Sequence, residues 1–295
     1  MVDHLPLLDP WILLLVGAPL NGAAGLLSFW RGSVDAGGAT AGAALGTVVF
    51  VAGGPIGWIL LAGFVLSSTV MTRFRAEEKE WLSSIQEKGG RRDALQVVAN
   101  GGAGMMAAVL FRLTGETSWV FGLAAAYASA NADTWASEIG VLSARRPFSL
   151  LTFRPVPRGL SGGVTLLGLA ASLCGALLIA GLFALGWTIT LKTSAGFIFR
   201  LAAVTGTGVL GSVVDSILGS TIQAQYGPGP RRVADPAGDS AGDPRAGSLI
   251  TERRTSGGVP NVLVRGLPFV TNDFVNAAST MAAALAGIGL AALTR

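Results

Sequence analysis

The chain has 295 residues, of which 51% are hydrophobic and only 13% are charged. A soluble domain carries about 25% charged residues, so this chain has too little charge to cover a water-exposed surface. The charged residues are also grouped, with long uncharged runs between them, as in proteins that cross a bilayer several times. We therefore attribute the formal net charge of +4 to membrane topology and not to nucleic-acid binding. The single cysteine, Cys174, excludes a disulfide framework.

We predict an all-α, polytopic transmembrane bundle that forms a single domain over residues 1–295. Eight apolar runs carry this prediction, at 11–29, 36–52, 55–72, 95–113, 117–135, 161–187, 197–222 and 274–293. Most have the roughly 17–25 residues that a helix needs to cross a hydrocarbon core of about 30 Å. The second and fifth runs are marginal, so seven spans or a re-entrant hairpin stay open as alternatives.

Glycine is abundant, at 42 residues, and has no collagen-like period. Within the second run, Gly38, Gly42 and Gly46 recur every four residues. Small residues let membrane helices approach closely, so we expect these three to form a face for helix packing. The sequence leaves open whether the bundle forms a homo-oligomer.

The distribution of Lys and Arg predicts the orientation. With eight spans, all but four of the 21 Lys and Arg residues fall in loops on one side; the exceptions are Arg112, Lys192, Arg200 and Arg295. Basic loops stay in the cytoplasm. We therefore expect a cell-membrane protein with both termini outside and its polar loops inside.

A cationic cluster stands just before the fourth run. It contains Lys88, Arg91 and Arg92, and Asn100 follows inside the run. The cluster is a candidate phosphate-binding element, and its alternative interpretation is simple topological anchoring. The sequence contains no GxxxxGK[ST] motif, so nothing supports a P-loop ATPase.

The fifth run ends in polar residues. Asn131 and Asp133 lie near its cytoplasmic end, and Glu138 follows in the segment ANADTWASEIG. Ionisable side chains within membrane spans are expensive and are functional by default. Asparagine has a second interpretation, because amides also join membrane helices by hydrogen bonds.

A glycine-rich turn precedes the sixth run. The segment RGLSGGV contains Arg158, Ser161, Gly162 and Gly163. Exposed backbone N–H groups before a helix N-terminus favour an anion, so this turn is a second candidate phosphate site. A tight structural turn is the alternative interpretation.

The seventh run carries Asp215, about 10 Å from its inner end at 1.5 Å per residue. The loop that follows, 223–268, is rich in Gly, Pro, Asp and Arg, which break helices. We expect a flexible cytoplasmic connector. The alternative is a lid over the site, with Arg253 and Arg254 reaching a phosphate.

The eighth run opens with three polar residues, Asn272, Asp273 and Asn276. The two asparagines are four positions apart, so they share one helix face. We include both amides among the candidate substrate contacts.

Topology brings Asp133, Glu138, Asp215 and Asp273 to one depth. Carboxylates that gather without cations repel one another, and carboxylate and amide oxygens suit Mg²⁺. The one histidine, His4, lies outside the first run, so zinc and haem are not expected. We predict that Asp133 and Asp215 are the catalytic and principal Mg²⁺-binding carboxylates, with Glu138 and Asp273 in support.

The motifs NADTWASEIG, GLSGGVTLLG, GSVVDSILGSTIQ and NDFVN, with KGGRRDALQVVANGG upstream, resemble one integral membrane family. It is the family that contains plant phytyl-phosphate kinase, and the resemblance runs from about Gly63 to the C-terminus. The resemblance implies phosphorylation of an isoprenoid monophosphate, phytyl or another prenyl phosphate, to the diphosphate. It also implies a nucleoside triphosphate donor, CTP, used with Mg²⁺ at the cytoplasmic face.

Two other functions remain alternatives. A nucleotidyltransferase that makes a CDP-lipid would use the same metal and phosphate groups, and it would release pyrophosphate instead of CDP. A transporter with a gated acidic site is the second alternative. Transporter sites usually lie near the membrane midplane on broken helices, whereas Asp133 and Asp273 lie close to the inner interface.

Overall fold

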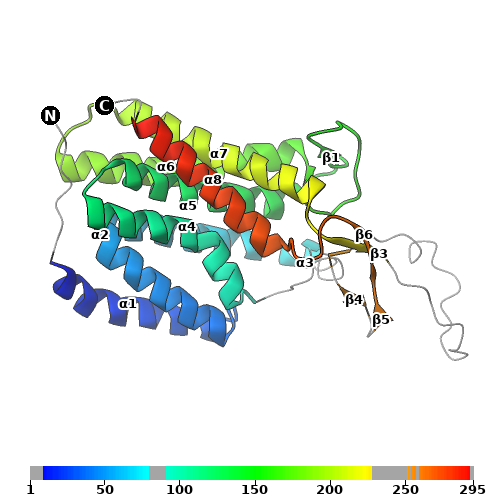
Figure 1. Ribbon diagram of the computed structural model, residues 1–295, viewed down its shortest axis with the longest axis horizontal. Helices are drawn as coiled ribbons and strands as arrows, with labels where there is room; N and C mark the ends of the chain where they lie inside the picture. The colour runs from blue at the N-terminus through cyan, green and yellow to red at the C-terminus, as the bar shows by residue number, and fades with distance from the viewer. Residues whose placement is uncertain (1–8, 80–90, 228–250, 253, 257–258, 293–295) are drawn as a thin grey trace, which may run out of the picture.

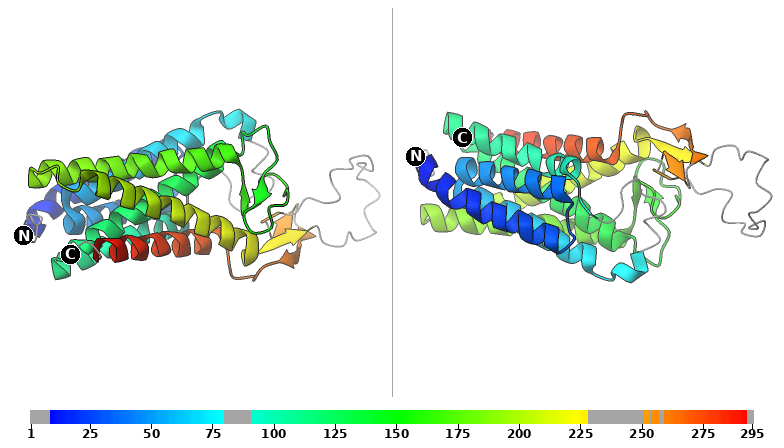
Figure 2. Two further views of the ribbon diagram at one scale, coloured as in Figure 1. Left: turned by 90° about the horizontal axis from the view of Figure 1, so that it is seen from above. Right: turned by 90° about the horizontal axis from the view of Figure 1, so that it is seen from below.

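The computed structural model describes residues 9–79, 91–227, 251–252, 254–256 and 259–292. Its helices are α1 (Pro10–Trp30), α2 (Ala36–Arg73), α3 (Ala76–Lys79), α4 (Ala94–Thr114), α5 (Ser118–Gly140), α6 (Leu166–Leu191), α7 (Phe197–Thr221) and α8 (Asn272–Ala292). The long helices lie side by side as one bundle (Figures 1 and 2). The predicted all-α membrane fold is confirmed.

Helix α2 doubles back on itself. Gly54 has a φ of 64° inside it, and Pro55 follows. The Arg73 side chain, at the end of α2, donates to the carbonyl oxygen of Arg31 at 3.2 Å and to Ser33 Oγ at 3.1 Å. Both acceptors lie just before α2 begins, so the helix returns to the end of the bundle where it started. Its two arms correspond to the second and third predicted spans.

Helix α5 occupies the centre of the bundle. It packs against α2, α4, α6, α7 and α8, and its first two-thirds are almost wholly buried. Six helices in the described part of the chain are long and apolar enough to cross a membrane, and α5 is not among them. Its neighbours are other helices rather than lipid, which explains why alanine replaces larger apolar residues along it. That eight passes cross the bilayer stays a prediction.

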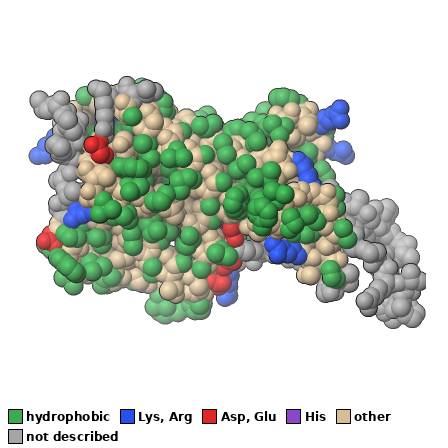
Figure 3. All heavy atoms as spheres, viewed as in Figure 1, with side chains coloured by type: hydrophobic (Ala, Val, Ile, Leu, Met, Phe, Trp, Pro, Cys, Tyr) green, Lys and Arg blue, Asp and Glu red, His purple; other side chains and the backbone are tan. Residues whose placement is uncertain are grey.

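The outer helices expose large apolar side chains. Leu15 on α1 and Ile189 on α6 are 77% and 74% exposed, which suits contact with lipid rather than water. Figure 3 shows hydrophobic side chains over most of the visible helical face.

The predicted glycine face on α2 is only partly formed. Gly38 lies against the backbone carbonyl of Arg92, and Gly46 lies against the Asn21 side chain, so neither position has space for a methyl group. Gly42 has open space around it. The four-residue spacing therefore marks contacts with two different partners, the α4 entry and α1.

The loops at one end of the bundle form short antiparallel pairs. Strand β1 (Phe148–Ser149) pairs with β2 (Gly163–Val164), β3 (Gln225–Gly227) with β6 (Val262–Arg265), and β4 (Thr255–Ser256) with β5 (Val259–Pro260). The predicted sixth span began at residue 161, but α6 begins at Leu166 because β2 and the N-cap Thr165 precede it. The described parts of the 223–268 loop thus contain two short strand pairs, which the prediction of a flexible connector did not include.

All three strand pairs lie at the end of the bundle opposite the start of α1 and the end of α8 (Figures 1 and 2). The same end holds the entries to α4, α6 and α8. The structure therefore gathers the described parts of the basic loops at one end, as the eight-span topology predicts.

Candidate active site

Most of the predicted site residues line one pocket of about 290 Å³ at the loop end of the bundle. The predicted residues in its lining are Arg92, Asn100, Asp133, Glu138, Arg158, Ser161, Gly162, Gly163, Asp215, Asn272, Asp273 and Asn276. They come from α4, α5, α7, α8 and the turn before α6. Segments that are far apart in the sequence thus meet around one cavity, as expected if the topology brings these residues to one depth in the membrane.

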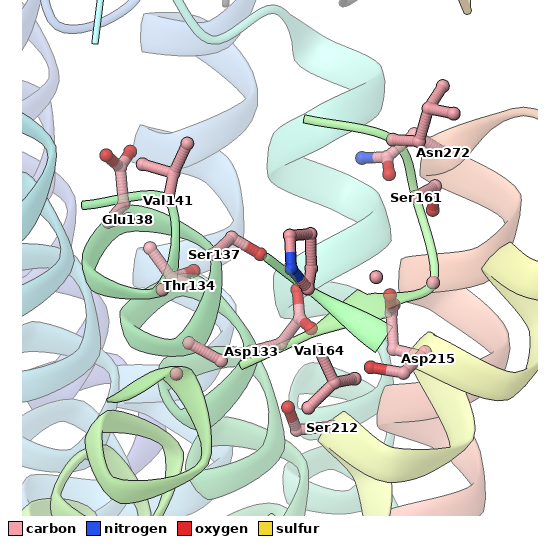
Figure 4. A pocket seen from close by; sticks show the side chains of 18 of the residues that line it. Asp133, Thr134, Ser137, Glu138, Val141, Ser161, Val164, Ser212, Asp215 and Asn272 are labelled. Carbon is pink, nitrogen blue, oxygen red and sulfur yellow. The ribbon is translucent and has the colours of Figure 1, made fainter. Parts of the chain in front are cut away.

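Asp133 on α5 and Asp215 on α7 form the acidic centre of the pocket (Figure 4). They are close enough for their charges to interact. The Ser212 side chain hydrogen-bonds to Asp133, and Ser279 Oγ of α8 donates to Asp215 Oδ2 at 3.2 Å. Both carboxylates are therefore held by hydroxyl groups from neighbouring helices.

This pair fits a magnesium ion. Mg²⁺ commonly takes one or two protein carboxylates and completes its shell with water and substrate phosphate oxygens. No group of three or more His, Cys, Asp or Glu side chains within the described residues is arranged to hold a metal. The four predicted metal carboxylates therefore do not form a single cluster, although all four line the pocket.

Glu138 already has a cationic partner. Its Oε2 atom lies 2.6 Å from Nζ of Lys79, and the side chains are 22% and 6% exposed, respectively. Figure 4 shows Glu138 apart from Asp133 and Asp215. The structure therefore separates Glu138 from the acidic pair with which it was predicted to share a metal.

Arg92 approaches the pocket from the segment before α4. Its backbone N–H donates to Ser33 at 3.1 Å, and its carbonyl accepts from Asp35 at 3.0 Å, which fixes the segment against the α1–α2 loop. Burial lowers the pKa of the Arg92 guanidinium, and the charge of Glu138 opposes that shift. A guanidinium remains protonated near neutral pH even so, and Arg92 therefore supplies positive charge to the pocket.

The glycine-rich turn is held on both sides. Arg158 Nη2 donates to the carbonyl oxygen of Ala144 at 2.8 Å, and Ser161 Oγ donates to Gln223 Oε1 at 2.6 Å. Gly162 has a φ of 82°, and a Cβ atom there would collide with the backbone of Ser220. Glycine is thus required for the close approach of the turn to α7, while the same turn lines the pocket.

Two predicted contacts within the described residues, Asn131 and Arg91, do not line the pocket. Asn131 is fully buried, with Oδ1 accepting from Ser67 and Ser68 at 2.7 and 3.2 Å and Nδ2 donating to the carbonyl of Gly175 at 2.8 Å. It joins α5 to α2 and α6, which is the helix-packing alternative. Arg91 is exposed and lies near Gly32 outside the pocket lining. Lys88 lies outside the described residues.

Of the two arginines in the lid hypothesis, the structure describes only Arg254. Arg254 Nη2 donates to the carbonyl of Pro268 at 3.0 Å, and this residue is not part of the pocket lining. Arg253 lies outside the described residues.

The loop instead contributes an acid that sequence reasoning missed. Glu252 lines the pocket and accepts a 2.9 Å hydrogen bond from Gln223 Nε2. Gln223 is 1% exposed and also accepts from Ser161, so it joins the glycine-rich turn to the segment that carries Glu252. The one sequence signal for this link was the polar residue Gln223 just after α7, and it did not stand out at the start of a loop rich in Gly, Pro, Asp and Arg.

The family model for integral membrane protein DUF92 matches residues 19–284. The chain belongs to this family. The resemblance found in the sequence motifs is therefore confirmed, together with the assignment to a multi-pass membrane protein.

Related proteins occur in plants and in a cyanobacterium. Protein PGR of Arabidopsis thaliana is 33% identical over 235 residues, which cover 73% of this chain and 81% of PGR. An uncharacterised membrane protein of Synechocystis, sll0875, is 27% identical over 187 residues, covering 62% of this chain and 69% of its own. Protein VTE6, a chloroplastic protein of Arabidopsis thaliana, is 27% identical over 199 residues, covering 66% of this chain and 58% of VTE6. No solved structure matches.

Proposed function

We propose that this protein is a membrane kinase that phosphorylates a prenyl monophosphate, phytyl phosphate or a related isoprenoid, to the diphosphate. In this proposal the donor is a nucleoside triphosphate, CTP, and the reaction requires Mg²⁺. The observation that carries the proposal is the meeting of the Asp133–Asp215 pair with Arg92 and Arg158 in one pocket at the end of a membrane bundle. The relation to VTE6 and the motif resemblance to the phytyl-phosphate kinase family support the same reaction.

The pocket has the groups that phosphoryl transfer needs. Such transfer depends mainly on positioning and on stabilising negative charge, through Mg²⁺ and cationic donors. Asp133 and Asp215 would hold the metal, which would neutralise charge on the donor phosphates. Arg92 and Arg158 would bind phosphate oxygens by charge-assisted hydrogen bonds.

In the proposed step, an oxygen of the prenyl monophosphate attacks the γ-phosphorus of the donor. The bond between that phosphorus and the β–γ bridging oxygen breaks, and the nucleoside diphosphate leaves. A monophosphate is already ionised near neutral pH, so no base must take a proton from it. The lining residues that the structure describes supply Asp, Glu, Arg, Asn and Ser side chains for this step.

The architecture suits an amphipathic acceptor. The pocket is polar around the acidic pair, and Leu150, Val164 and Leu169 supply apolar lining near the entry to α6. The prenyl chain would lie among apolar groups while its phosphate meets the arginines and the metal.

The test is incubation of the purified full-length protein with Mg²⁺, CTP and a panel of prenyl phosphates, followed by mass spectrometry of the lipids. We expect prenyl diphosphate together with CDP. A CDP-lipid and pyrophosphate would instead establish the nucleotidyltransferase. The absence of any new lipid across the panel, with folded protein, would reject the proposed function.

A further inference from the structure

A buried lysine lies behind the pocket in an arrangement that topology alone does not require. Lys79 is on α3, and its ammonium donates to the carbonyl oxygens of Met71 and Thr72 at 2.9 and 3.0 Å, at the end of α2. Its third contact is Glu138 Oε2 at 2.6 Å. With its side chain 6% exposed, Lys79 has all three donor directions occupied inside the protein. A lysine that only anchored a loop at the membrane surface would keep its charge in water.

Glu138 interacts with two cations. It is paired with Lys79, and its charge also acts on Arg92, although no hydrogen bond joins Glu138 to Arg92 among the contacts of the described residues. Glu138 and Arg92 line the same pocket. Without Lys79, the Glu138 carboxylate would still act on Arg92 in the same pocket, and a buried charge must find a partner.

We propose that Lys79 is a positioning residue for the anion site, which rests on the proposed function in assigning Arg92 to a substrate phosphate. Lys79 holds Glu138 and thereby leaves the Arg92 guanidinium directed at the pocket. Two cations and one carboxylate leave a net positive charge, which Arg92 presents to the pocket. Glu138 accordingly acts through Arg92 and not as a magnesium ligand.

The arrangement makes a prediction that a purely structural lysine does not. In Lys79→Met, Glu138 loses its partner and pairs with Arg92, so phosphate binding weakens even though Arg92 is intact. In the double variant Lys79→Met with Glu138→Gln, no carboxylate competes for Arg92, and phosphate binding returns. If Lys79 served only to cap α2, the second substitution would restore nothing.

The experiment measures binding of inorganic pyrophosphate by isothermal titration calorimetry, using the full chain in detergent without nucleotide. We expect Lys79→Met to raise the dissociation constant at least tenfold, Lys79→Arg to stay within about threefold of wild type, and the double variant to recover to within about threefold. Melting temperatures measured on the same preparations show that each variant is folded. Arg92→Ala serves as the reference for loss of the Arg92 contact alone.

An unchanged dissociation constant in folded Lys79→Met would overturn the inference, as would a double variant that binds no better than Lys79→Met. Failure of the wild-type protein to bind pyrophosphate would do the same. The titrations do not depend on turnover. An absence of kinase activity with the expected binding pattern would reject the proposed reaction and leave the role of Lys79 standing.

Discussion

Asp133 on α5 and Asp215 on α7 face the same pocket closely enough for their charges to interact, and each accepts a hydrogen bond from a serine on a neighbouring helix. Two charges at this depth in a membrane bundle are expensive unless a cation accompanies them. The ion pairs between described residues are Arg75–Glu78 and Lys79–Glu138, and neither involves these two acids. No structural salt bridge between described residues accounts for the pair, and we propose that a bound cation, Mg²⁺, accompanies it.

The first prediction follows from this pair. Asp133→Asn and Asp215→Asn keep the shape of the side chain but remove the charge that a metal needs. We expect each variant to lose Mg²⁺-dependent turnover by at least a hundredfold while its melting temperature stays close to that of wild type. Activity and melting temperature are measured on the same preparations. Near-normal specific activity in both variants would end the metal-site hypothesis.

The two pocket arginines give the second prediction. Arg92→Ala and Arg158→Ala should each remove one of the proposed charge-assisted contacts to phosphate, worth about 1.5–3 kcal/mol, or roughly ten- to a hundredfold in kcat/KM. Arg146→Ala is the matched control, because Arg146 is an exposed arginine in the same loop as Arg158 and does not line the pocket. We expect its kinetics to match wild type. If all three variants had the same kcat/KM, Arg92 and Arg158 would serve only as topological anchors.

Asn131 gives the third prediction, which concerns stability. Its amide makes three hydrogen bonds to α2 and α6, so Asn131→Leu leaves the Ser67 and Ser68 hydroxyls and the Gly175 carbonyl without that partner. Each buried group left unsatisfied costs about 1–3 kcal/mol. We expect a clearly lower melting temperature with normal KM in the folded fraction. Asn276→Leu, in the pocket wall, should show the opposite pattern, and a raised KM in Asn131→Leu would contradict the assignment.

The sequence was sufficient to predict the helical membrane bundle and most of the residues that line the pocket, for one physical reason. Asp133 and Asp215 stand in apolar runs, where a polar residue is conspicuous, and topology alone brings the helix ends together. Asn131 and Asn276 show the limit of this reasoning. Both are amides near the same helix ends, and only the rotation of each helix about its axis decides which one faces the pocket.

The sequence could not predict contacts between charged residues that are far apart along the chain, for a related reason. From the sequence, Lys79 is one more basic loop residue and Glu138 is a candidate metal ligand. Their ion pair depends on the tertiary contact between α3 and α5. Glu252 was missed because its segment has a composition typical of a connector, whereas β3 and β6 fix part of it beside the pocket. Tertiary packing decides these contacts, and no local pattern encodes them.

The fourth prediction concerns orientation. In a Cys174→Ala background, a cysteine at Arg154 should react with a membrane-impermeant maleimide only from the cytoplasmic side. Ser194→Cys, in the exposed connection between α6 and α7 at the opposite end of the bundle, should react only from outside. Labelling with the two sides exchanged would reverse the predicted topology and place the pocket outside the cell.

The last prediction concerns Gln223, which joins the glycine-rich turn to the segment that carries Glu252. Its Oε1 atom accepts from Ser161 at 2.6 Å, and its Nε2 atom donates to Glu252 at 2.9 Å. Gln223→Leu removes both bonds at a site that is 1% exposed, with a cost of about 1–3 kcal/mol for each polar group left unsatisfied. We expect a lower melting temperature and a raised KM for the prenyl phosphate, because the turn with Ser161 and the carboxylate of Glu252 both lose their fixed positions in the pocket wall. Ser161→Ala breaks only one of the two bonds and should cause a smaller rise in KM.

Gln225→Leu is the matched control. Gln225 is the same residue type and is also buried, but its side chain makes one long hydrogen bond, 3.4 Å to the carbonyl of Gly219. Its KM should stay near the wild-type value even where the melting temperature falls. If Gln223→Leu and Gln225→Leu changed KM equally, the pair of bonds through Gln223 would be ordinary packing and not a support of the site.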